Sequence, residues 1–359
     1  MAHIVYGVSG EGSGHSSRAQ VIAAHLEDRG HHVTIVSYDR GYRNLRDRFV
    51  VFETEGLHIS SCENQVSKRR TIMDNLQRLP QGRRKLNEIK ARLFREDPPM
   101  MVFTDFEPMT AYLANYYDLP LVTVDNQHRL RYMAYACPSD FKSDQILTEN
   151  IIRAMVPRPD VSLVTTFYFG ETKNDRTFLF PPILRDEVLG LKATETDHVL
   201  VYLTSGFESF LEQLGGFPRE RFIVYGCGET REEGNLVFKS PSRDGFLQDL
   251  AACKAVMATA GFTLITEALH LHKPYLALPM RGQFEQEINA VFLAQLGYGL
   301  NVRRVTSEAI GDFLYHLPEY KRRLSDYVVT GNAAILEMID RLLAEDGRLA
   351  RAFHERRSG

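Results

Sequence analysis

The chain has 359 residues, of which 44% are hydrophobic and 25% are charged, and its formal net charge is −3. This composition excludes a collagenous, disordered or generally nucleic-acid-binding chain, and the length predicts roughly two domains. Four cysteines without CxxC spacing give no basis for a zinc site or a disulfide framework.

The sequence shows no targeting or membrane-spanning segment. The first residues, Met1-Ala-His-Ile, lack the basic region and apolar core of a signal peptide. No apolar run approaches the roughly 18 to 20 residues that span a bilayer. We therefore expect a cytoplasmic protein, with peripheral work at the inner face of the membrane as the alternative.

The first 40 residues predict a βαβ unit. Residues 3–8 and 32–37 have the pattern of buried parallel strands, and the apolar spacing between them predicts a helix that Gly30 ends. The turn Gly7-Val-Ser-Gly-Glu-Gly-Ser-Gly-His15 lies at the carboxyl end of the first strand, where open α/β sheets bind ligands. Glycines let a ligand approach the backbone closely, and a histidine makes this turn a candidate catalytic loop.

Lysine and arginine far outnumber acidic residues in the segment from Lys68 to Arg95. This pattern predicts a helical excursion with a solvated basic face. The alternative is a patch for an acidic acceptor or for anionic lipid headgroups. The sequence leaves both possibilities open.

Polar residues follow two further predicted strands of the first half, at residues 100–104 and 120–124. Asp105 comes directly after the first of these strands, and Asp125 and His128 follow the second. Carboxyl ends of parallel strands meet at one edge of a sheet, so these side chains are expected at the same edge as the glycine turn.

The domain boundaries follow from changes in periodicity. Residues 170–192 show little periodicity and contain Pro181-Pro182, so we expect a linker there, and a second alternation of strands and helices follows. We therefore expect an α/β fold of two Rossmann-like, doubly wound domains that face each other across a cleft. The expected domains are residues 1–170, residues 171–332 including the linker, and an amphipathic C-terminal helix at 333–359 that packs on the body and can cross back to the first domain.

The second half carries the most specific pattern. It reads Thr259-Ala-Gly-Phe-Thr-Leu-Ile-Thr-Glu267, followed by Lys273-Pro-Tyr-Leu-Ala-Leu-Pro279 and Glu285-Gln-Glu-Ile-Asn-Ala290. The order and spacing of these pieces resemble the donor-binding region of glycosyltransferases of the GT-B superfamily, in the MurG-like and UDP-glucosyltransferase-like group. The turn ending in His15 is similar to the acceptor loop of that group. The resemblance implies the GT-B fold and sugar transfer from a nucleoside-diphosphate sugar.

The turn at Gly261 opens a helix whose first N–H groups and positive dipole end can hold a diphosphate. Thr263 can add a hydroxyl donor, and Glu267 lies one turn further on, where the resemblance implies hydrogen bonds to ribose hydroxyls. The resemblance also assigns the donor sugar to Glu285 and Gln286. The expected donor-binding residues are Ser205, Gly206, Gly261, Phe262, Thr263, Glu267, Glu285 and Gln286.

His15 is the expected catalytic base, because an inverting transfer needs a group that takes the proton of the acceptor hydroxyl. A carboxylate that orients the imidazole and stabilises its protonated form would complete a pair. The resemblance implies Asp105 for this role, because it corresponds best to the partner in the plant-type relatives. Strand-end aspartates often cap the following helix instead, and the next strand end supplies rival residues. The expected acceptor-side residues are Gly12, Gly14, Asp125 and His128.

We expect no metal ion and no cofactor beyond the donor co-substrate, for which UDP is the favoured nucleotide. The helix terminus at Gly261 can stabilise the leaving diphosphate, and no DxD-type motif stands in a matching place. The first loop departs from the family pattern at Glu11 and at Ser16-Ser17-Arg18. These differences lie on the acceptor side, so the identity of the acceptor stays open.

Three other functions compete with this interpretation. A nicotinamide-dependent oxidoreductase would use Gly10-x-Gly12 and Asp39, but His15 stands where that fingerprint requires a third small residue. A UDP-sugar 2-epimerase shares the fold and the donor site and needs no acceptor. A non-catalytic nucleotide-sugar-binding protein would bind the donor without transferring its sugar.

Overall fold

The computed structural model describes residues 1–56, 61–62, 65–66, 82–203, 208–228 and 230–358. The chain divides into two compact units. The first unit comprises Met1–Ser60, Ser67–Arg185 and Thr330–Gly359, and the second comprises Ser61–Val66 and Asp186–Val329. Both termini therefore belong to the first unit.

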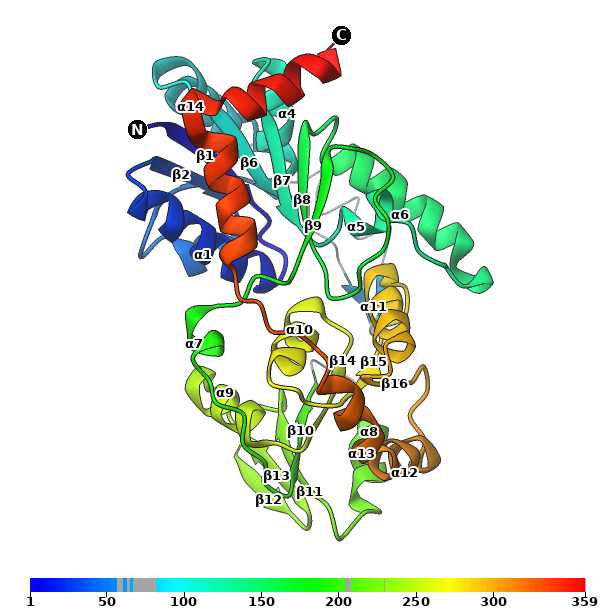
Figure 1. Ribbon diagram of the computed structural model, residues 1–359. Helices are drawn as coiled ribbons and strands as arrows, with labels where there is room; N and C mark the ends of the chain where they lie inside the picture. The colour runs from blue at the N-terminus through cyan, green and yellow to red at the C-terminus, as the bar shows by residue number, and fades with distance from the viewer. Residues whose placement is uncertain (57–60, 63–64, 67–81, 204–207, 229, 359) are drawn as a thin grey trace. The chain divides into compact units, whose positions relative to one another are not determined.

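Seven parallel strands among the described residues form the central sheet of the first unit (Figure 1). Their spatial order is β3-β2-β1-β6-β7-β8-β9, so the winding reverses at β1, which pairs with β2 on one side and β6 on the other. Ligands bind doubly wound sheets at such a reversal, outside the carboxyl ends of the strands. The strands are β1 (His3–Val8), β2 (His32–Ser37), β3 (Val50–Glu53), β6 (Met101–Asp105), β7 (Leu121–Asp125), β8 (Val161–Thr165) and β9 (Thr177–Phe180).

Helices cover both faces of this sheet, because successive side chains of a strand point to opposite faces. Ile4 and Tyr6 of β1 share one core with α1 (Gly14–Asp28) and α14 (Ala333–Ser358). Val5 of β1 belongs to the opposite core, with the helix at residues 82–89, its π-helical continuation η1 (Lys90–Glu96) and α4 (Pro108–Tyr116). The unit also contains α2 (Asp39–Leu45), α5 (Arg129–Tyr132), η2 (Ser139–Phe141) and α6 (Lys142–Met155).

The second unit repeats the doubly wound arrangement. In its described residues the strand order is β12-β13-β11-β10-β14-β15-β16, with β12 antiparallel at the edge and the winding reversed at β10. The strands are β10 (His198–Tyr202), β11 (Arg221–Tyr225), β12 (Arg231–Glu233), β13 (Leu236–Lys239), β14 (Ala255–Thr259), β15 (Tyr275–Leu278) and β16 (Gly299–Asn301). The helices are α7 (Asp186–Leu189), α8 (Glu208–Gly215), α9 (Arg243–Ala252), α10 (Phe262–His270), α11 (Phe284–Gln295), α12 (Ser307–Tyr315) and α13 (Leu317–Leu324). A separate antiparallel pair joins β4 (Ser61–Cys62) and β5 (Gln65–Val66).

The predicted α/β fold with two doubly wound halves is confirmed. The strand β9 differs from the expectation, because it lies within residues 170–192, where the sequence predicts a linker, and pairs in parallel with β8. Its four residues, Thr177–Phe180, are mostly apolar, but the run is short and Pro181-Pro182 follow it directly, which is typical of a linker.

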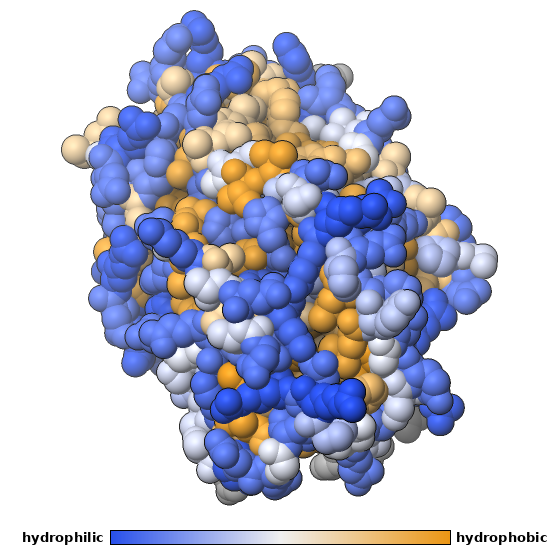
Figure 2. Space-filling model, turned by 60° about the horizontal axis from the view of Figure 1, so that its bottom comes forward, coloured by the Kyte–Doolittle hydropathy of each residue, from blue (hydrophilic) through white to orange (hydrophobic). Residues whose placement is uncertain are grey.

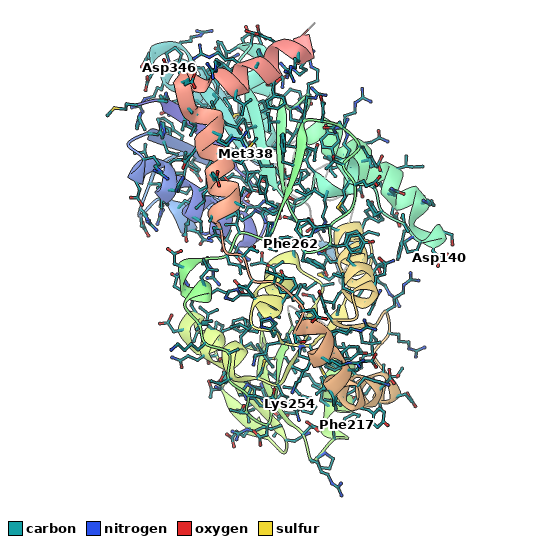
Figure 3. The ribbon with its side chains drawn as sticks, in the orientation of Figure 1. Asp140, Phe217, Lys254, Phe262, Met338 and Asp346 are labelled. Carbon is teal, nitrogen blue, oxygen red and sulfur yellow. The ribbon has the colours of Figure 1, made fainter. Side chains whose placement is uncertain are left out.

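The C-terminal helix also differs from a single continuous amphipathic segment. Residues 344–347 leave the helical conformation, and Glu345, Asp346 and Gly347 have φ of 51°, 55° and 77°. Both halves still pack on the first unit, through Met338 before the bend and Phe353 after it. Figure 3 labels Met338 on the first half and Asp346 at the bend.

Figure 2 shows a face on which hydrophilic residues predominate, with hydrophobic patches between them. Within the described part of the chain, no helix combines the length and the apolar character that crossing a membrane requires.

Asn332 connects the two segments of the first unit that flank residues 186–329 of the second unit. Its side-chain oxygen accepts a hydrogen bond from the N–H of Leu184 over 3.0 Å, and its side-chain nitrogen donates to the Leu184 carbonyl over 2.7 Å. Both residues are buried. The amide of Asn332 therefore satisfies both backbone groups of a residue 148 positions away.

We predict that Asn332→Ala destabilises the first unit by about 1–3 kcal/mol, because two buried backbone groups of Leu184 lose their partner. Urea unfolding should show a lower midpoint for this variant. Asn150→Ala is the control, since the Asn150 amide bonds to Ile146 on an exposed helix surface. Equal midpoints for Asn332→Ala and the wild type would contradict the prediction.

Candidate active site

The carboxyl ends of β1 and β6 bring the glycine turn and Asp105 together. Val8 of β1 lies opposite Asp105 of β6 in the parallel register. The N–H of Ser9 then donates a hydrogen bond to the carbonyl oxygen of Asp105 over 3.0 Å. The chain turns into α1, whose second residue is His15. The register of two neighbouring strands thus places both side chains at the point where the winding reverses.

His15 and Asp105 form a buried, hydrogen-bonded pair. The Nδ1 of His15 lies 2.6 Å from Oδ1 of Asp105, and Asp105 is fully buried whereas His15 is 8% exposed. An ionised carboxylate only accepts hydrogen bonds, so Nδ1 carries the proton of this bond. The Nε2 of the neutral imidazole then keeps its lone pair and can take a proton from a substrate.

Arg18 completes this buried cluster. Its Nε donates to Oδ2 of Asp105 over 2.9 Å, and its Nη2 donates to Oδ1 over 2.8 Å. Burial alone would raise the pKa of the Asp105 carboxyl, but Arg18 and His15 together bring that pKa below its ordinary value. Burial likewise opposes the charge of Arg18, and Asp105 outweighs it, so the pKa of the guanidinium is raised. Asp105 and Arg18 are therefore both ionised.

The sequence did not assign Arg18 a role beyond its departure from the family's loop pattern. Its spacing is the signal that could have found it, because residues i and i+3 of a helix lie on one face and Arg18 is three residues after His15. Ala19 and Ile22 of the same helix are fully buried, which places Arg18 beside the inward face.

The glycines of the turn are required for different structural reasons. A Cβ at Gly10 would lie 2.2 Å from the carbonyl oxygen of Tyr38, the residue after β2, so the backbone there excludes a side chain. Gly12 has a φ of +75°, which favours glycine, and no described atom lies within 4 Å of where its Cβ would stand. Gly14 is the first residue of α1. The acceptor-side role of Gly12 and Gly14 stays a prediction.

Asp125 and His128 form a separate pair at the end of β7. Asp125 accepts hydrogen bonds from the His128 N–H over 2.8 Å and from the His128 imidazole Nδ1 over 2.7 Å. Both side chains are fully buried, and among the described residues the Nε2 of His128 has no hydrogen-bond partner. The Asp125–His128 pair has the same chemical groups as the Asp105–His15 pair. The two differ in exposure, because His128 is fully buried whereas His15 is 8% exposed. The acceptor-side role of Asp125 and His128 stays a prediction.

The turn at Gly261 lies where the winding of the second sheet reverses. Gly261 is the N-cap of α10, and no described side chain caps this helix. Phe262, labelled in Figure 3, is buried, Thr263 on the first turn is partly exposed, and Glu267 one turn later is 4% exposed. Uncapped N–H groups at a helix terminus suit an anion such as a diphosphate. The donor-binding roles of these residues stay predictions.

The side chains of α11 support this turn. The amide nitrogen of Asn289, which is fully buried, donates to the Ala260 carbonyl over 2.9 Å and so fixes the residue before Gly261. Gln286 accepts from the Met280 N–H over 3.1 Å and donates to Gln283 over 2.6 Å. Glu285 is partly buried. The loop before α11 is thus held by the amide of Gln286, and the sugar-binding role of Glu285 and Gln286 stays a prediction.

Two of the expected donor-binding residues, Ser205 and Gly206, lie outside the described residues. The strand that precedes them, β10, ends at Tyr202 and pairs with β14. The turn at Gly261 follows β14, so both predicted phosphate turns leave neighbouring strands of the second sheet.

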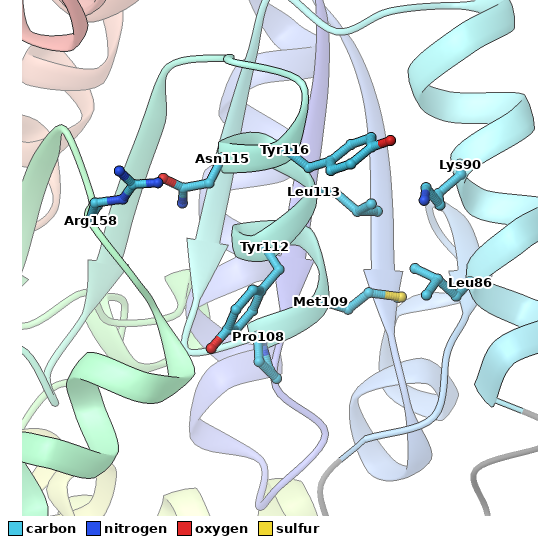
Figure 4. Close-up of a pocket in the computed structure, with 9 residues that line it drawn as sticks. All are labelled: Leu86, Lys90, Pro108, Met109, Tyr112, Leu113, Asn115, Tyr116 and Arg158. Carbon is cyan, nitrogen blue, oxygen red and sulfur yellow. The ribbon is translucent and has the colours of Figure 1, made fainter. Parts of the chain in front are cut away.

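A pocket of about 550 Å³ lies beside α4 in the first unit (Figure 4). Apolar side chains of α4 line it, among them Met109, Leu113 and the exposed rings of Tyr112 and Tyr116. The Lys90 ammonium, from the basic segment, lies 4.7 Å from the centre of the Tyr116 ring. The pocket is therefore an apolar groove with a cation at its edge.

The described cations of the basic segment are largely engaged within the first unit. Lys85 donates to Glu55 over 2.7 Å and lies 3.2 Å from Glu53. Burial would lower the pKa of Lys85, but hydrogen bonds to these carboxylates raise it above its ordinary value. Arg92 pairs with Glu88 over 3.5 Å. The basic residues before 82 lie outside the described residues, and contact of this segment with lipid or acceptor stays a prediction.

One group of side chains in the described residues could hold a metal ion, namely His3, His32 and Asp97. Their candidate ligand atoms lie within 4.8 Å of one another. His3 and His32 are the first residues of β1 and β2, whereas His15 and Asp105 lie at the carboxyl ends of the strands. The group therefore has no part in the candidate active site.

Comparison with known families supports the sequence pattern over most of the chain. The model of the family described as "Glycosyl transferase family 1" matches residues 2–318. No curated protein sequence matches the chain.

Solved structures of glycosyltransferases share the fold at low sequence identity. The glycotransferase of kitacinnamycin has 16% identity and a TM-score of 0.65, with 99% of each chain covered. LpCGTa in complex with UDP has 15% identity and a TM-score of 0.66, with 96% of this chain and 100% of that chain covered. The spinosyn rhamnosyltransferase SpnG complexed with thymidine diphosphate has 14% identity and a TM-score of 0.62, with 95% of this chain and 100% of that chain covered. The predicted GT-B fold is thereby confirmed.

Proposed function

The chain belongs to glycosyl transferase family 1 and is a transferase, and we propose that it moves a sugar from a nucleoside-diphosphate sugar to an acceptor hydroxyl, with inversion and without a metal ion. The observation that carries this proposal is the 2.6 Å contact between Nδ1 of His15 and Oδ1 of Asp105. It leaves Nε2 of His15 as a proton acceptor at the reversal point of the first sheet.

The proposed reaction is a single displacement at the anomeric carbon. The acceptor oxygen forms a bond to that carbon while Nε2 of His15 takes the hydroxyl proton. The bond from the anomeric carbon to the diphosphate oxygen breaks, and its electron pair leaves with the nucleoside diphosphate. Attack opposite the leaving group inverts the configuration. Asp105 accepts the Nδ1–H bond throughout and stabilises the imidazolium that forms.

The donor is proposed to bind the second unit with its diphosphate at the start of α10. The positive end of this helix would stabilise the charge that develops on the leaving group, which is the work a metal ion does in other transferases. Glu267, buried one turn further, would accept hydrogen bonds from ribose hydroxyls. A carboxylate can accept hydrogen bonds from two neighbouring hydroxyls. The ribose of UDP has both a 2′ and a 3′ hydroxyl, so UDP is favoured over a deoxyribose nucleotide.

The groove beside α4 is proposed to meet the anionic inner face of a membrane together with the basic segment. Tyr112 and Tyr116 are 53% and 68% exposed and line a mainly apolar groove, and exposed apolar patches of this kind mark interaction sites. Rings with a polar tip favour the boundary between water and lipid. Lys90 adds a positive charge at this edge.

We predict that His15→Ala lowers the rate of transfer by about 100-fold or more, because the acceptor proton loses its base. Donor affinity should stay within about twofold, since the donor is assigned to the second unit. Initial rates and thermal-shift titration with UDP-, dTDP- and GDP-sugars measure the two effects. His25→Ala, on the same helix, is the control. Weak donor binding with normal turnover in His15→Ala would overturn the assignment.

Glu267→Ala is predicted to raise the donor KM by about tenfold or more while kcat falls less, since hydrogen bonds to the ribose are lost. The wild type should also bind UDP more tightly than 2′-deoxy-UDP, and the variant should not distinguish them. Equal affinities of the wild type for the two nucleotides would contradict the ribose assignment. Product NMR in the same assays reports the anomeric configuration, and an epimerised donor formed without acceptor would show an epimerase instead.

Membrane contact is predicted to depend on the two exposed tyrosines. The wild type should sediment with vesicles of phosphatidylglycerol and phosphatidylcholine, and binding should weaken with salt because cations contribute. The double variant Tyr112→Ser/Tyr116→Ser should lose most of this binding. Tyr315→Ser, which changes an 80% exposed tyrosine of the second unit, is the control. Absence of wild-type sedimentation with these vesicles would exclude this contact.

A further inference from the structure

Arg18 stands beside the proposed catalytic pair, although the displacement itself gives it no part. We propose that Arg18 is a positioning residue, which fixes the Asp105 carboxylate toward His15 and extends the pH range in which His15 accepts a proton to lower pH. The inference rests on the proposed function, because that function makes His15 the base.

The geometry gives Arg18 control over the orientation of the carboxylate. Its two nitrogens reach both oxygens of Asp105, Nε to Oδ2 over 2.9 Å and Nη2 to Oδ1 over 2.8 Å. Such a fork holds the plane of a carboxylate, which a single hydrogen bond leaves free to rotate. The same Oδ1 receives the His15 bond of 2.6 Å. The plane that Arg18 fixes is therefore the one that sets the direction of the imidazole.

The charge balance gives Arg18 its effect on pH. With neutral His15, the charges of Arg18 and Asp105 cancel, and a proton on His15 leaves a net positive charge. Without Arg18, the same proton would neutralise the carboxylate instead. The guanidinium Nη2 lies 3.2 Å from Nδ1 of His15, and Arg18 is 4% exposed, so water screens this repulsion poorly. Arg18 thus opposes proton uptake at low pH.

Two other titratable groups act on this cluster from neighbouring strands. Tyr6 on β1 is fully buried, and burial followed by the charge of Asp105 raises its pKa well above the ordinary value, so it stays neutral. Asp125 on β7 interacts with the Arg18 charge. Neither group reaches the Asp105 carboxylate with a hydrogen bond among those described, whereas Arg18 makes two.

The test compares two substitutions in the full-length chain. Arg18→Met keeps the length of the side chain and removes both charge and fork, whereas Arg18→Lys keeps the charge and removes the fork. We expect Arg18→Met to move the acid limb of the kcat/KM profile up by about one pH unit or more, and Arg18→Lys to leave it within a few tenths. Both variants should lower kcat at the optimum about tenfold with unchanged donor KM, because orientation is lost. Coincident acid limbs for Arg18→Met and the wild type would overturn the inference.

A double-mutant cycle tests whether Arg18 acts through Asp105. In the Asp105→Asn background, Arg18→Met should cause no further loss of kcat, because the carboxylate it positions is gone. Losses that add in the double variant would show an independent structural role and contradict the proposal. Arg29→Met, on the exposed end of the same helix, is the control for a general effect of removing a cation.

A readout independent of transfer separates this inference from the proposed function. NMR titration follows the His15 ring, identified by its absence from the spectrum of His15→Gln. A higher titration midpoint in Arg18→Met than in the wild type supports the inference even where no acceptor gives a product. An unchanged midpoint refutes it even where transfer is observed. Thermal unfolding and donor titration of each variant establish that it is folded.

Discussion

The parallel pairing of β1 with β6 is the constraint on which the candidate site depends. These strands are neighbours only because the winding of the first sheet reverses between them. One consequence is local, since the loop after β1 and the last residue of β6 leave the sheet side by side. The other consequence concerns the whole sheet. The crossover connections on the two sides of the reversal run in opposite directions, so they leave a crevice outside the carboxyl ends of β1 and β6. The second sheet repeats this geometry at β10 and β14, where the predicted phosphate turns begin.

Burial strengthens the electrostatic interactions between the polar groups at the carboxyl ends of β1 and β6. The Arg18–Asp105 contact would contribute little on an exposed surface, but Asp105 is fully buried and Arg18 nearly so. Removing one partner from such a pair leaves an uncompensated charge. Burial also acts on Glu107, the N-cap of α4. This carboxylate accepts hydrogen bonds from the N–H groups of Met109 and Thr110. Burial raises the pKa of Glu107 despite these bonds, so its environment differs from that of Asp105 two residues earlier.

The sequence revealed those parts of the fold whose signal is local. Buried parallel strands such as β1, β6 and β14 are short apolar runs, and their polar ends drew attention to Asp105. β9 is also a short, mostly apolar run, but it lies in a segment of little periodicity and is followed by two prolines, so the sequence favours a linker there. Gly347 is the only local sign of the bend in α14, and one glycine does not distinguish a bend from a helix end.

The site was predictable to a similar extent. The catalytic candidates came from a loop motif and strand ends, and the structure brings His15 and Asp105 into contact across 90 positions of sequence. It also pairs Asp125 with His128 through local bonds that a strand-end aspartate commonly makes. The role of Arg18 is not predictable from the sequence, because a charged residue on a helix is ordinarily solvated and its burial depends on a carboxylate 87 positions away.

The bond between Asn332 and Leu184 also bears on how the polypeptide is threaded. The first unit is interrupted after Arg185 and resumed at Thr330, and these two breakpoints are tied together by one side-chain amide. Topologically, the larger segment of the second unit, Asp186–Val329, is an insertion in the chain of the first. The segments on both sides of this insertion carry the first sheet, the C-terminal helix and the His15–Asp105 pair. The two units are therefore nested in the sequence and are not joined end to end.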